Sequence, residues 1–176
     1  LINFAGQELQ SFTDTDSDGM SDIFETQYGF DINDPADALL DLDGDGLINL
    51  QEAINRTNPS ISDTDGDGLT DADEFFIHRT NPALADTDRD GLNDYDELNT
   101  HNTDPFIADS DEDGMTDGWE VQYGLDPLLD DASLDSDSDS ITNIDEFTRG
   151  SDPTSTDTDN DGLENAVDED DDNSIL

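Results

Sequence analysis

Aspartates recur at alternate positions of a twelve-residue segment that occurs seven times in this sequence. The copies, called loops 1 to 7 in chain order, begin at Asp14, Asp41, Asp63, Asp86, Asp109, Asp135 and Asp157, 22 to 27 residues apart. Loop 3 reads DTDGDGLTDADE, with aspartate at positions 1, 3 and 5, glycine at position 6 and glutamate at position 12. Alternate side chains of a coiled loop converge, and hard oxygen ligands of this kind suit Ca²⁺, which takes about six to eight of them. The spacing therefore predicts a calcium-binding loop in each copy.

The same ligand set is predicted for every loop. Positions 1, 3 and 5 each supply a carboxylate, position 7 its backbone carbonyl, position 9 a contact through water, and position 12 two carboxylate oxygens. We expect about seven or more calcium ions. The predicted ligands are Asp14, Asp16, Asp18, Met20, Asp22, Glu25, Asp41, Asp43, Asp45, Leu47, Asn49, Glu52, Asp63, Asp65, Asp67, Leu69, Asp71, Glu74, Asp86, Asp88, Asp90, Leu92, Asp94, Glu97, Asp109, Asp111, Asp113, Met115, Asp117, Glu120, Asp135, Asp137, Asp139, Ile141, Asn143, Glu146, Asp157, Asp159, Asp161, Leu163, Asn165 and Asp168.

Two loops depart from the pattern. Ser140 replaces the position-6 glycine of loop 6, where we expect a left-handed backbone that costs a non-glycine residue about 1 kcal/mol. Asp168 replaces the position-12 glutamate of loop 7 and is one methylene shorter. Loop 6 is therefore predicted to be the weakest of the array.

Composition excludes several classes of protein. The formal net charge is −46, with four basic residues against fifty acids, so internal ion pairs cannot neutralise the chain and a cationic partner is implied. Nucleic-acid binding needs clusters of Lys and Arg, and the four arginines of this chain form no such cluster in the sequence. The absence of cysteine excludes a disulfide scaffold, and no apolar run has the roughly 18 residues of a membrane-spanning helix. A low apolar content with high charge is also typical of disorder, but the strict phase of the aspartates favours an ordered repeat.

Each repeat is expected to carry one short helix. The Asp or Asn at position 9 is predicted as the N-cap. Helices are expected to end, after about two turns, before the Asn-Pro and Asp-Pro pairs at Asn58, Asn81, Asp104, Asp126 and Asp152. Position 7 is always apolar, and it is expected to pack against neighbouring repeats together with Leu39, Ile61, Leu84 and Ile107 before the loops and Phe24, Ile54, Phe75, Phe76, Leu98, Trp119, Val121 and Phe147 after them.

These patterns predict an elongated, calcium-stabilised tandem repeat array of irregular loops and short helices, with little or no sheet and a minimal hydrophobic core. Residues 14–172 form the seven repeats, residues 1–13 an N-terminal segment or the end of a preceding domain, and residues 173–176 a C-terminal tail. Two longer repeats carry the matching inserts Tyr28-Gly29-Phe30-Asp31 and Tyr123-Gly124-Leu125-Asp126.

The tandem DTDxDGL copies make residues 14 to 172 resemble the thrombospondin type 3 repeat family, in the cysteine-free form common in bacterial surface and secreted proteins. The resemblance implies an extended array, wrapped around calcium, that serves as a spacer or stalk between modules. Because no disulfide can form, rigidity is expected to come from metal and packing.

Three functions remain open at this point. The chain is predicted to be a calcium-ordered structural spacer in a secreted or cell-surface protein. The alternatives are a self-assembling filament or surface-layer subunit and a calcium-dependent docking or adhesion module. The expected partners are calcium and either other domains of the same protein or neighbouring copies, with no nucleic acid and no membrane insertion. No catalytic residues and no enzyme activity are predicted.

Other residues are given lesser roles. His78 and His101 are expected to be exposed helix ends rather than a metal pair, and Trp119 and Tyr123 to form local core. Extra carboxylates are offered as additional calcium contacts, at position 11 (Asp73, Asp96, Asp145) and near the prolines (Asp31, Asp104, Asp126, Asp152).

Overall fold

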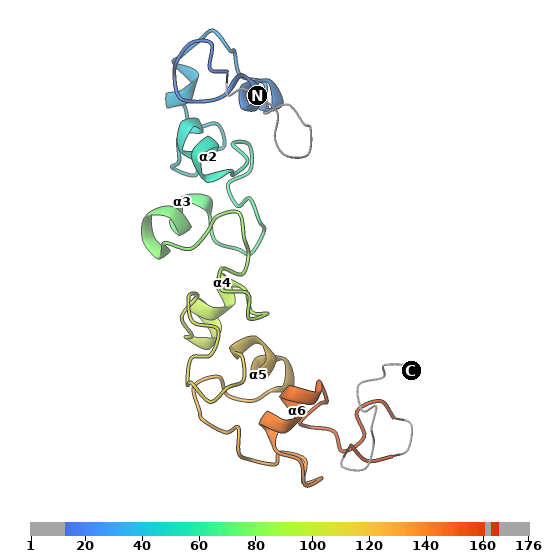
Figure 1. The fold of residues 1–176 in the computed structure, drawn as a ribbon. Helices are drawn as coiled ribbons and strands as arrows, with labels where there is room; N and C mark the ends of the chain where they lie inside the picture. The colour runs from blue at the N-terminus through green and yellow to red at the C-terminus, as the bar shows by residue number, and fades with distance from the viewer. Residues whose placement is uncertain (1–12, 161–162, 166–176) are drawn as a thin grey trace. The chain divides into compact units, whose positions relative to one another are not determined.

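The computed structural model describes residues 13–160 and 163–165. Over these residues the regular structure is helical and contains no strand, so the predicted combination of short helices, irregular loops and no sheet is confirmed there (Figure 1). The chain divides into two compact units, Leu1–Ala85 and Asp86–Leu176.

The first unit contains helices α1 (Asp22–Tyr28), α2 (Asn49–Asn55) and α3 (Asp71–Asp73), the last continued by the π-helical turn η2 (Glu74–His78). A short 3-10 helix, η1 (Asp37–Leu39), lies in the insert between α1 and loop 2. In the second unit α4 (Asp94–Asp96) continues into the π-helical turn η3 (Glu97–His101) and is followed by α5 (Asp117–Tyr123) and α6 (Asn143–Arg149). In each unit, helices therefore alternate with acidic loops along the chain (Figure 1).

The helices begin at position 9, which makes position 8 the N-cap. Residue 8 has an extended backbone in six repeats, and the side chains of Ser21, Thr70, Asn93 and Thr142 accept the N–H three residues on. The prediction that position 9 is the N-cap is wrong by one residue. Position 9 is instead the first helical residue, and its N–H closes the loop on the carbonyl before position 1, as from Asp71 to Ser62 at 3.0 Å.

The helices end before the residues that were predicted to stop them. They are followed by a residue in the left-handed region: Gly29, Arg56, Arg79, Asn102, Gly124 and Gly150. The N–H of this residue donates to the carbonyl of the position-12 glutamate, as from Arg79 to Glu74 at 2.6 Å. The left-handed cap therefore ends the helix, three residues earlier than the Asn58-Pro59 pair in repeat 2.

Fewer apolar side chains are buried than the sequence predicts. Position 7 is buried in loops 1 to 6, at Met20, Leu47, Leu69, Leu92, Met115 and Ile141. Several apolar residues that were expected to pack are exposed instead: Leu39 at 68%, Ile54 at 69%, Ile61 at 49%, Phe76 at 47% and Ile107 at 48%. Because each repeat buries only about one large apolar side chain, hydrophobic burial contributes little to holding an individual loop.

Candidate metal centres

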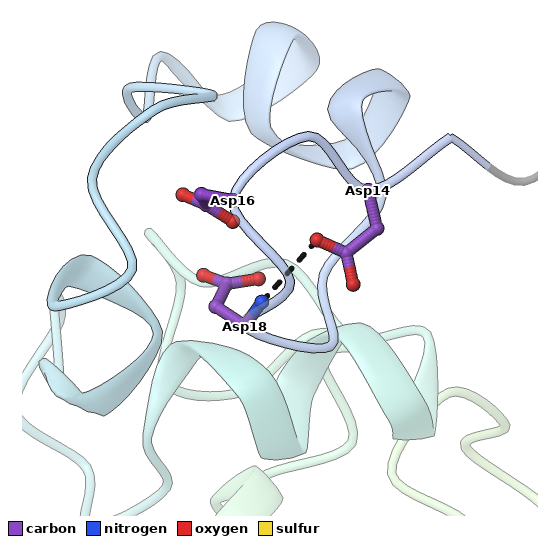
Figure 2. Close-up of side chains that lie close together, drawn as sticks. All are labelled: Asp14, Asp16 and Asp18. Atoms are coloured by element: carbon purple, nitrogen blue, oxygen red, sulfur yellow. Dashed lines mark hydrogen bonds between the residues drawn. The ribbon is translucent and has the colours of Figure 1, made fainter.

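The aspartates of each loop converge as their spacing predicts. Figure 2 shows the carboxylates of Asp14, Asp16 and Asp18 extending from one loop toward one another. One oxygen from each lies within 4.8 Å of the others, and the same holds for positions 1, 3 and 5 of loops 2, 3 and 4. In loops 5 and 6, Asp111 and Asp137 lie close enough to the position-1 and position-5 aspartates to be repelled by both.

Backbone N–H groups donate to the first aspartate of loops 1 to 6 and hold it in place. In loop 3 the Oδ1 of Asp63 accepts the N–H of Gly66 at 2.7 Å, and its Oδ2 accepts that of Gly68 at 3.2 Å. The N–H of Leu69 donates to Asp67 Oδ1 at 2.7 Å. The turn is therefore set by the loop's own carboxylates.

Two positions in each of loops 1 to 6 have a left-handed backbone. Position 6 does so in loops 1 to 6, and Ser140 adopts φ 84°, as the sequence predicts. Position 4 also has positive φ in all seven loops, although it is glycine only at Gly44 and Gly66; the others are Ser17, Arg89, Glu112, Ser138 and Asn160. The left-handed backbone at position 4 was not predicted, and its signals in the sequence are those two glycines and Asn160.

The position-12 glutamates of loops 1 to 6 are fully buried charged side chains. Glu25, Glu52, Glu74, Glu97, Glu120 and Glu146 are each 0% exposed. Both carboxylate oxygens of Glu25, Glu52 and Glu120 are buried without a hydrogen-bond partner, as is Oε2 of Glu74 and of Glu97. The other oxygens of Glu74 and Glu97 accept the hydroxyls of Thr80 and Thr103 at 3.1 and 3.2 Å. Each of these glutamates therefore has at least one carboxylate oxygen that is buried and accepts no hydrogen bond from the protein.

Burial and negative neighbours raise the pKa of these glutamates. Burial is the largest cause, followed by repulsion from the aspartates at positions 3 and 5 of the same loop. The pKa rises to about 7 for Glu25, about 8 for Glu52 and about 9 for Glu120. The pKa of Asp65 and of Asp88, both at position 3, rises to about 6 for the same reasons. Without a cation, burial and repulsion therefore disfavour the ionised form of these carboxylates. A bound cation would stabilise that form.

Position 9 serves the loop scaffold. In loop 3 the backbone N–H and hydroxyl of Thr64 donate to the two carboxylate oxygens of Asp71 at 2.8 and 2.7 Å. The same pair of bonds joins positions 2 and 9 in loops 1, 4 and 5. Asp71 thus connects the start of the helix to the start of the loop. The sequence predicted only a contact to calcium through water at this position, and did not predict these hydrogen bonds.

Within each unit, position 5 of one loop also binds the next repeat. Oδ2 of Asp45 accepts the N–H of Ala72 at 3.1 Å, and Oδ2 of Asp90 accepts the N–H of Gly118 at 2.9 Å. In both cases the donor is at position 10 of the following repeat. A predicted metal ligand is thereby connected directly to its neighbour.

Two aspartates outside the loops also approach them. Asp37 lies with Asp18 and Glu25, and Asp131 lies close enough to Glu120 to raise its pKa. The sequence analysis missed both, although each begins an Asp-Ala pair four residues before the next loop.

The remaining sequence expectations have mixed outcomes. The carboxylates near the prolines close local turns; for example, Asp104 Oδ1 accepts the N–H of Phe106 at 3.2 Å. His78 and His101 end η2 and η3 but are half-buried rather than exposed. The ring of Trp119 packs 5.0 Å from that of Tyr123 and 5.1 Å from that of Phe147 between ring centres.

Loop 7 is described only in part. Asp157, Asp159, Leu163 and Asn165 are placed, whereas Asp161 and Asp168 lie outside the described residues. Asn165 is 1% exposed, like position 9 of loops 2 to 6, but Leu163 is 50% exposed, unlike position 7 of loops 1 to 6. The other predicted ligands belong to described loops.

Comparisons with known proteins agree with this repeat geometry. The family model described as "Bacterial TSP3 repeat" matches residues 63–85, 86–106, 109–129 and 157–167, and these matches begin at the first aspartates of loops 3, 4, 5 and 7. The chain therefore carries bacterial TSP3 repeats, which confirms the family expected from the sequence.

Two solved structures show local likeness. A "Biofilm associated protein - B domain" is 40% identical over 26% of this chain and 11% of its own, with a TM-score of 0.25. A "Biofilm associated protein - BSP domain" is 42% identical over 24% of this chain and 7% of its own, with a TM-score of 0.24. The chain thus spans about a tenth or less of the proteins it resembles. No curated protein matches it. Among the placed residues, no helix combines the length and apolar character needed to cross a membrane.

Proposed function

We propose that residues 14–172 are a calcium-binding repeat array that acts as a structural spacer or stalk in a secreted or cell-surface protein. The observation that carries the proposal is the burial of the position-12 glutamates beside loop aspartates, with carboxylate oxygens that have no protein partner. An isolated buried carboxylate is strongly unfavourable unless a cation or a proton neutralises it. The four basic residues of the chain are too few to neutralise the loops. A proton on the glutamate would leave the clustered aspartates charged, whereas a bound cation would neutralise both.

The donor set favours calcium. In loop 3 it consists of Asp63, Asp65, Asp67 and Glu74, all oxygen donors. A set of hard carboxylate oxygens suits Ca²⁺, Mg²⁺ or Mn²⁺ and does not suit zinc or copper. Loops that can supply about six or more oxygens, with a bidentate glutamate at position 12, match the larger and less rigid coordination of calcium.

Calcium would supply most of the stabilisation of such an array. Extracellular calcium modules bind with dissociation constants of about 10⁻⁴ to 10⁻³ M. At ten times that concentration one site contributes about 1.4 kcal/mol, so seven sites contribute about 10 kcal/mol. This equals the stability of a whole ordinary domain, about 5–15 kcal/mol, in a chain whose repeats bury little apolar surface.

The contacts between repeats support the role of a spacer. Asp45 and Asp90 are predicted ligands that also accept hydrogen bonds from the following repeat. A cation that fixes either carboxylate also fixes the neighbouring helix start, so occupancy of the loops stiffens each unit. We place the array outside the cell because it carries bacterial TSP3 repeats, and dissociation constants of about 10⁻⁴ to 10⁻³ M would fit surroundings that are rich in calcium. No enzymatic role is proposed.

Self-association is a second candidate function. Both inserts expose leucines, with Leu39 at 68% and Leu40 at 59% in the first and Leu128 at 52% and Leu129 at 55% in the second. Such side chains could join copies into a filament or layer.

Chelation of the purified chain tests the proposal. Helix content by circular dichroism and the radius of gyration by X-ray scattering are measured in millimolar calcium and in excess chelator, with magnesium as the matched control. We expect the helix signal to fall and the radius to rise only when calcium is removed. An unchanged chain in chelator would contradict calcium-dependent folding. Electron microscopy in calcium separates the two functions, because single particles indicate a spacer and filaments indicate self-assembly.

A further inference from the structure

A carboxylate from the first insert reaches loop 1. Asp37 belongs to η1, and one of its oxygens lies within 4.8 Å of one oxygen each of Asp18 and Glu25. Asp18 is position 5 of loop 1, and Glu25 is position 12, on α1. The cluster therefore joins three separate segments: the loop, the helix that follows it, and the insert.

Glu25 and Asp37 are buried and Asp18 is half-buried, and each of the three has a carboxylate oxygen that accepts no hydrogen bond from the protein. Asp37 is 9% exposed and Glu25 0%. Oδ2 of Asp37 accepts the N–H of Asp31 at 3.0 Å, which orients the carboxylate, whereas its Oδ1 is buried without a hydrogen-bond partner. Both oxygens of Glu25 and Oδ2 of Asp18 are likewise buried and unpartnered.

The backbone holds Asp37 in this position. Its carbonyl accepts the side-chain amide of Asn49 at 2.7 Å, and the N–H of Leu40 at 3.1 Å. The bond from Asp31 needs only one neutral acceptor, which an asparagine would supply as well. The negative charge of Asp37 therefore has no structural use among these contacts, and beside Asp18 and Glu25 it is repulsive unless a cation lies between them.

We propose that Asp37 is an additional ligand of the calcium centre of loop 1, so that the ion fastens the insert to the loop. The inference rests on the proposed function. It does not extend to the second insert, because Asp131 has no carboxylate oxygen that is both buried and without a hydrogen-bond partner, and its Oδ1 accepts the side-chain amide of Asn143 at 3.1 Å. It also differs from repeat 2, where the position-5 carboxylate accepts a hydrogen bond from Ala72.

The test compares Asp37→Asn with Asp34→Asn in the full chain. Asp34 is an exposed carboxylate of the same insert whose Oδ1 accepts the N–H of Ala36 at 3.1 Å, a bond that asparagine can keep. Hydrogen exchange is followed by mass spectrometry across a calcium titration, in peptides covering loop 1, the insert 31–40 and loop 3.

For Asp37→Asn we expect the calcium midpoint of loop 1 to rise at least about tenfold, while loop 3 is unchanged. Protection of the insert should rise in step with loop 1, at the same shifted midpoint. Asp34→Asn should leave every midpoint at the wild-type value.

An unchanged loop 1 midpoint in Asp37→Asn would overturn the inference and leave the proposed function standing. A variant that stays unprotected in loop 1 and the insert at saturating calcium would also overturn it, because it would assign Asp37 a folding role. If no peptide of the wild-type chain responds to calcium, the proposed function itself fails.

Discussion

Replacing Gly118 with alanine tests how much the contact between repeat 5 and loop 4 contributes to stability, because helix propensity and this contact act in opposite directions. Gly118 is the second residue of α5, and its N–H donates to Asp90 Oδ2 of loop 4 at 2.9 Å. A Cβ at this position would lie 2.6 Å from the Asp90 carbonyl oxygen, 2.7 Å from the Gly91 carbonyl carbon and 2.8 Å from the Leu92 nitrogen. All three are backbone atoms, so no side-chain rotation can relieve the contact.

Two effects of opposite sign set the magnitude. Alanine is better than glycine inside a helix by about 1 kcal/mol, whereas forcing atoms into a packed site costs about 1–3 kcal/mol. Because the contacts are shorter than any ordinary Cβ contact, we expect the steric cost to exceed the gain in helix propensity, with a net loss of up to about 2 kcal/mol. The displaced carboxylate of Asp90 should weaken calcium binding in loop 4 by roughly fivefold or more, which corresponds to about 1 kcal/mol.

Repeat 3 offers the matched control. Ala72 occupies position 10 there, and its N–H donates to Asp45 at 3.1 Å. Its Cβ lies 3.7 Å from the place a Cβ would occupy on Gly46, so alanine fits. Ala72→Gly should therefore destabilise by about 0.5–1 kcal/mol through helix propensity alone.

The assay is thermal unfolding in saturating calcium, combined with hydrogen exchange of loop 4 during a calcium titration. Gly118→Ala should lower the melting temperature and raise the calcium midpoint of loop 4. A higher melting temperature with an unchanged midpoint would show that propensity dominates, and it would refute the docking argument.

Three further substitutions test separate parts of the account. Calcium binding is followed by hydrogen exchange of the affected loop across a calcium titration, stability by thermal unfolding, and helix content by circular dichroism. Ser140→Gly should tighten calcium binding in loop 6 about fivefold, because φ is 84° there and relief of left-handed strain is worth about 1 kcal/mol; equal midpoints for loops 3 and 6 in the wild-type chain would contradict this. Thr64→Val should destabilise repeat 3 by about 1–3 kcal/mol, since it leaves an oxygen of Asp71 and the N–H of Asn58 without their bonds; an unchanged melting temperature would count against the scaffold role. Glu74→Gln should weaken calcium binding in loop 3 at least about tenfold. In the calcium-free chain it should raise the helix content, because it removes a buried charge. Loss of helix both with and without calcium would argue against a ligand role for Glu74.

The family and the converging aspartates could be predicted because their signals are repeated. Position 1, 3 and 5 aspartates recur in phase in all seven loops, and the chemistry of calcium requires side chains at that spacing. The apolar residue at position 7 recurs in the same way and is buried in loops 1 to 6.

The helix boundaries were predicted less well because neighbouring residues carry equivalent signals. Positions 8 and 9 both hold capping types, as in Thr70-Asp71, and propensity cannot tell which one caps. The helix ends depend on left-handed residues such as Arg56 and Arg79, which have no preference for that conformation. At these residues the hydrogen bond from the backbone N–H to the carbonyl of the position-12 glutamate fixes where the helix ends.

The contacts between segments could not be predicted from one sequence. Asp37 reaches loop 1 because η1 and Asn49 fix its backbone, and this depends on the path of the insert. The same holds for Gly118, whose role follows from the close approach of loop 4. Neither residue belongs to the twelve-residue pattern of the loop it contacts.

The count of bound calcium ions tests the central claim most directly. The full chain is dialysed to equilibrium against millimolar calcium, and bound calcium is measured by elemental analysis, with the calcium-free dialysate as the reference. The account predicts at least about seven ions per chain, one for each loop, released together with the loss of helix signal on chelation. Binding of only one or two ions, or no binding above the nonspecific level of a scrambled chain of equal charge, would contradict it.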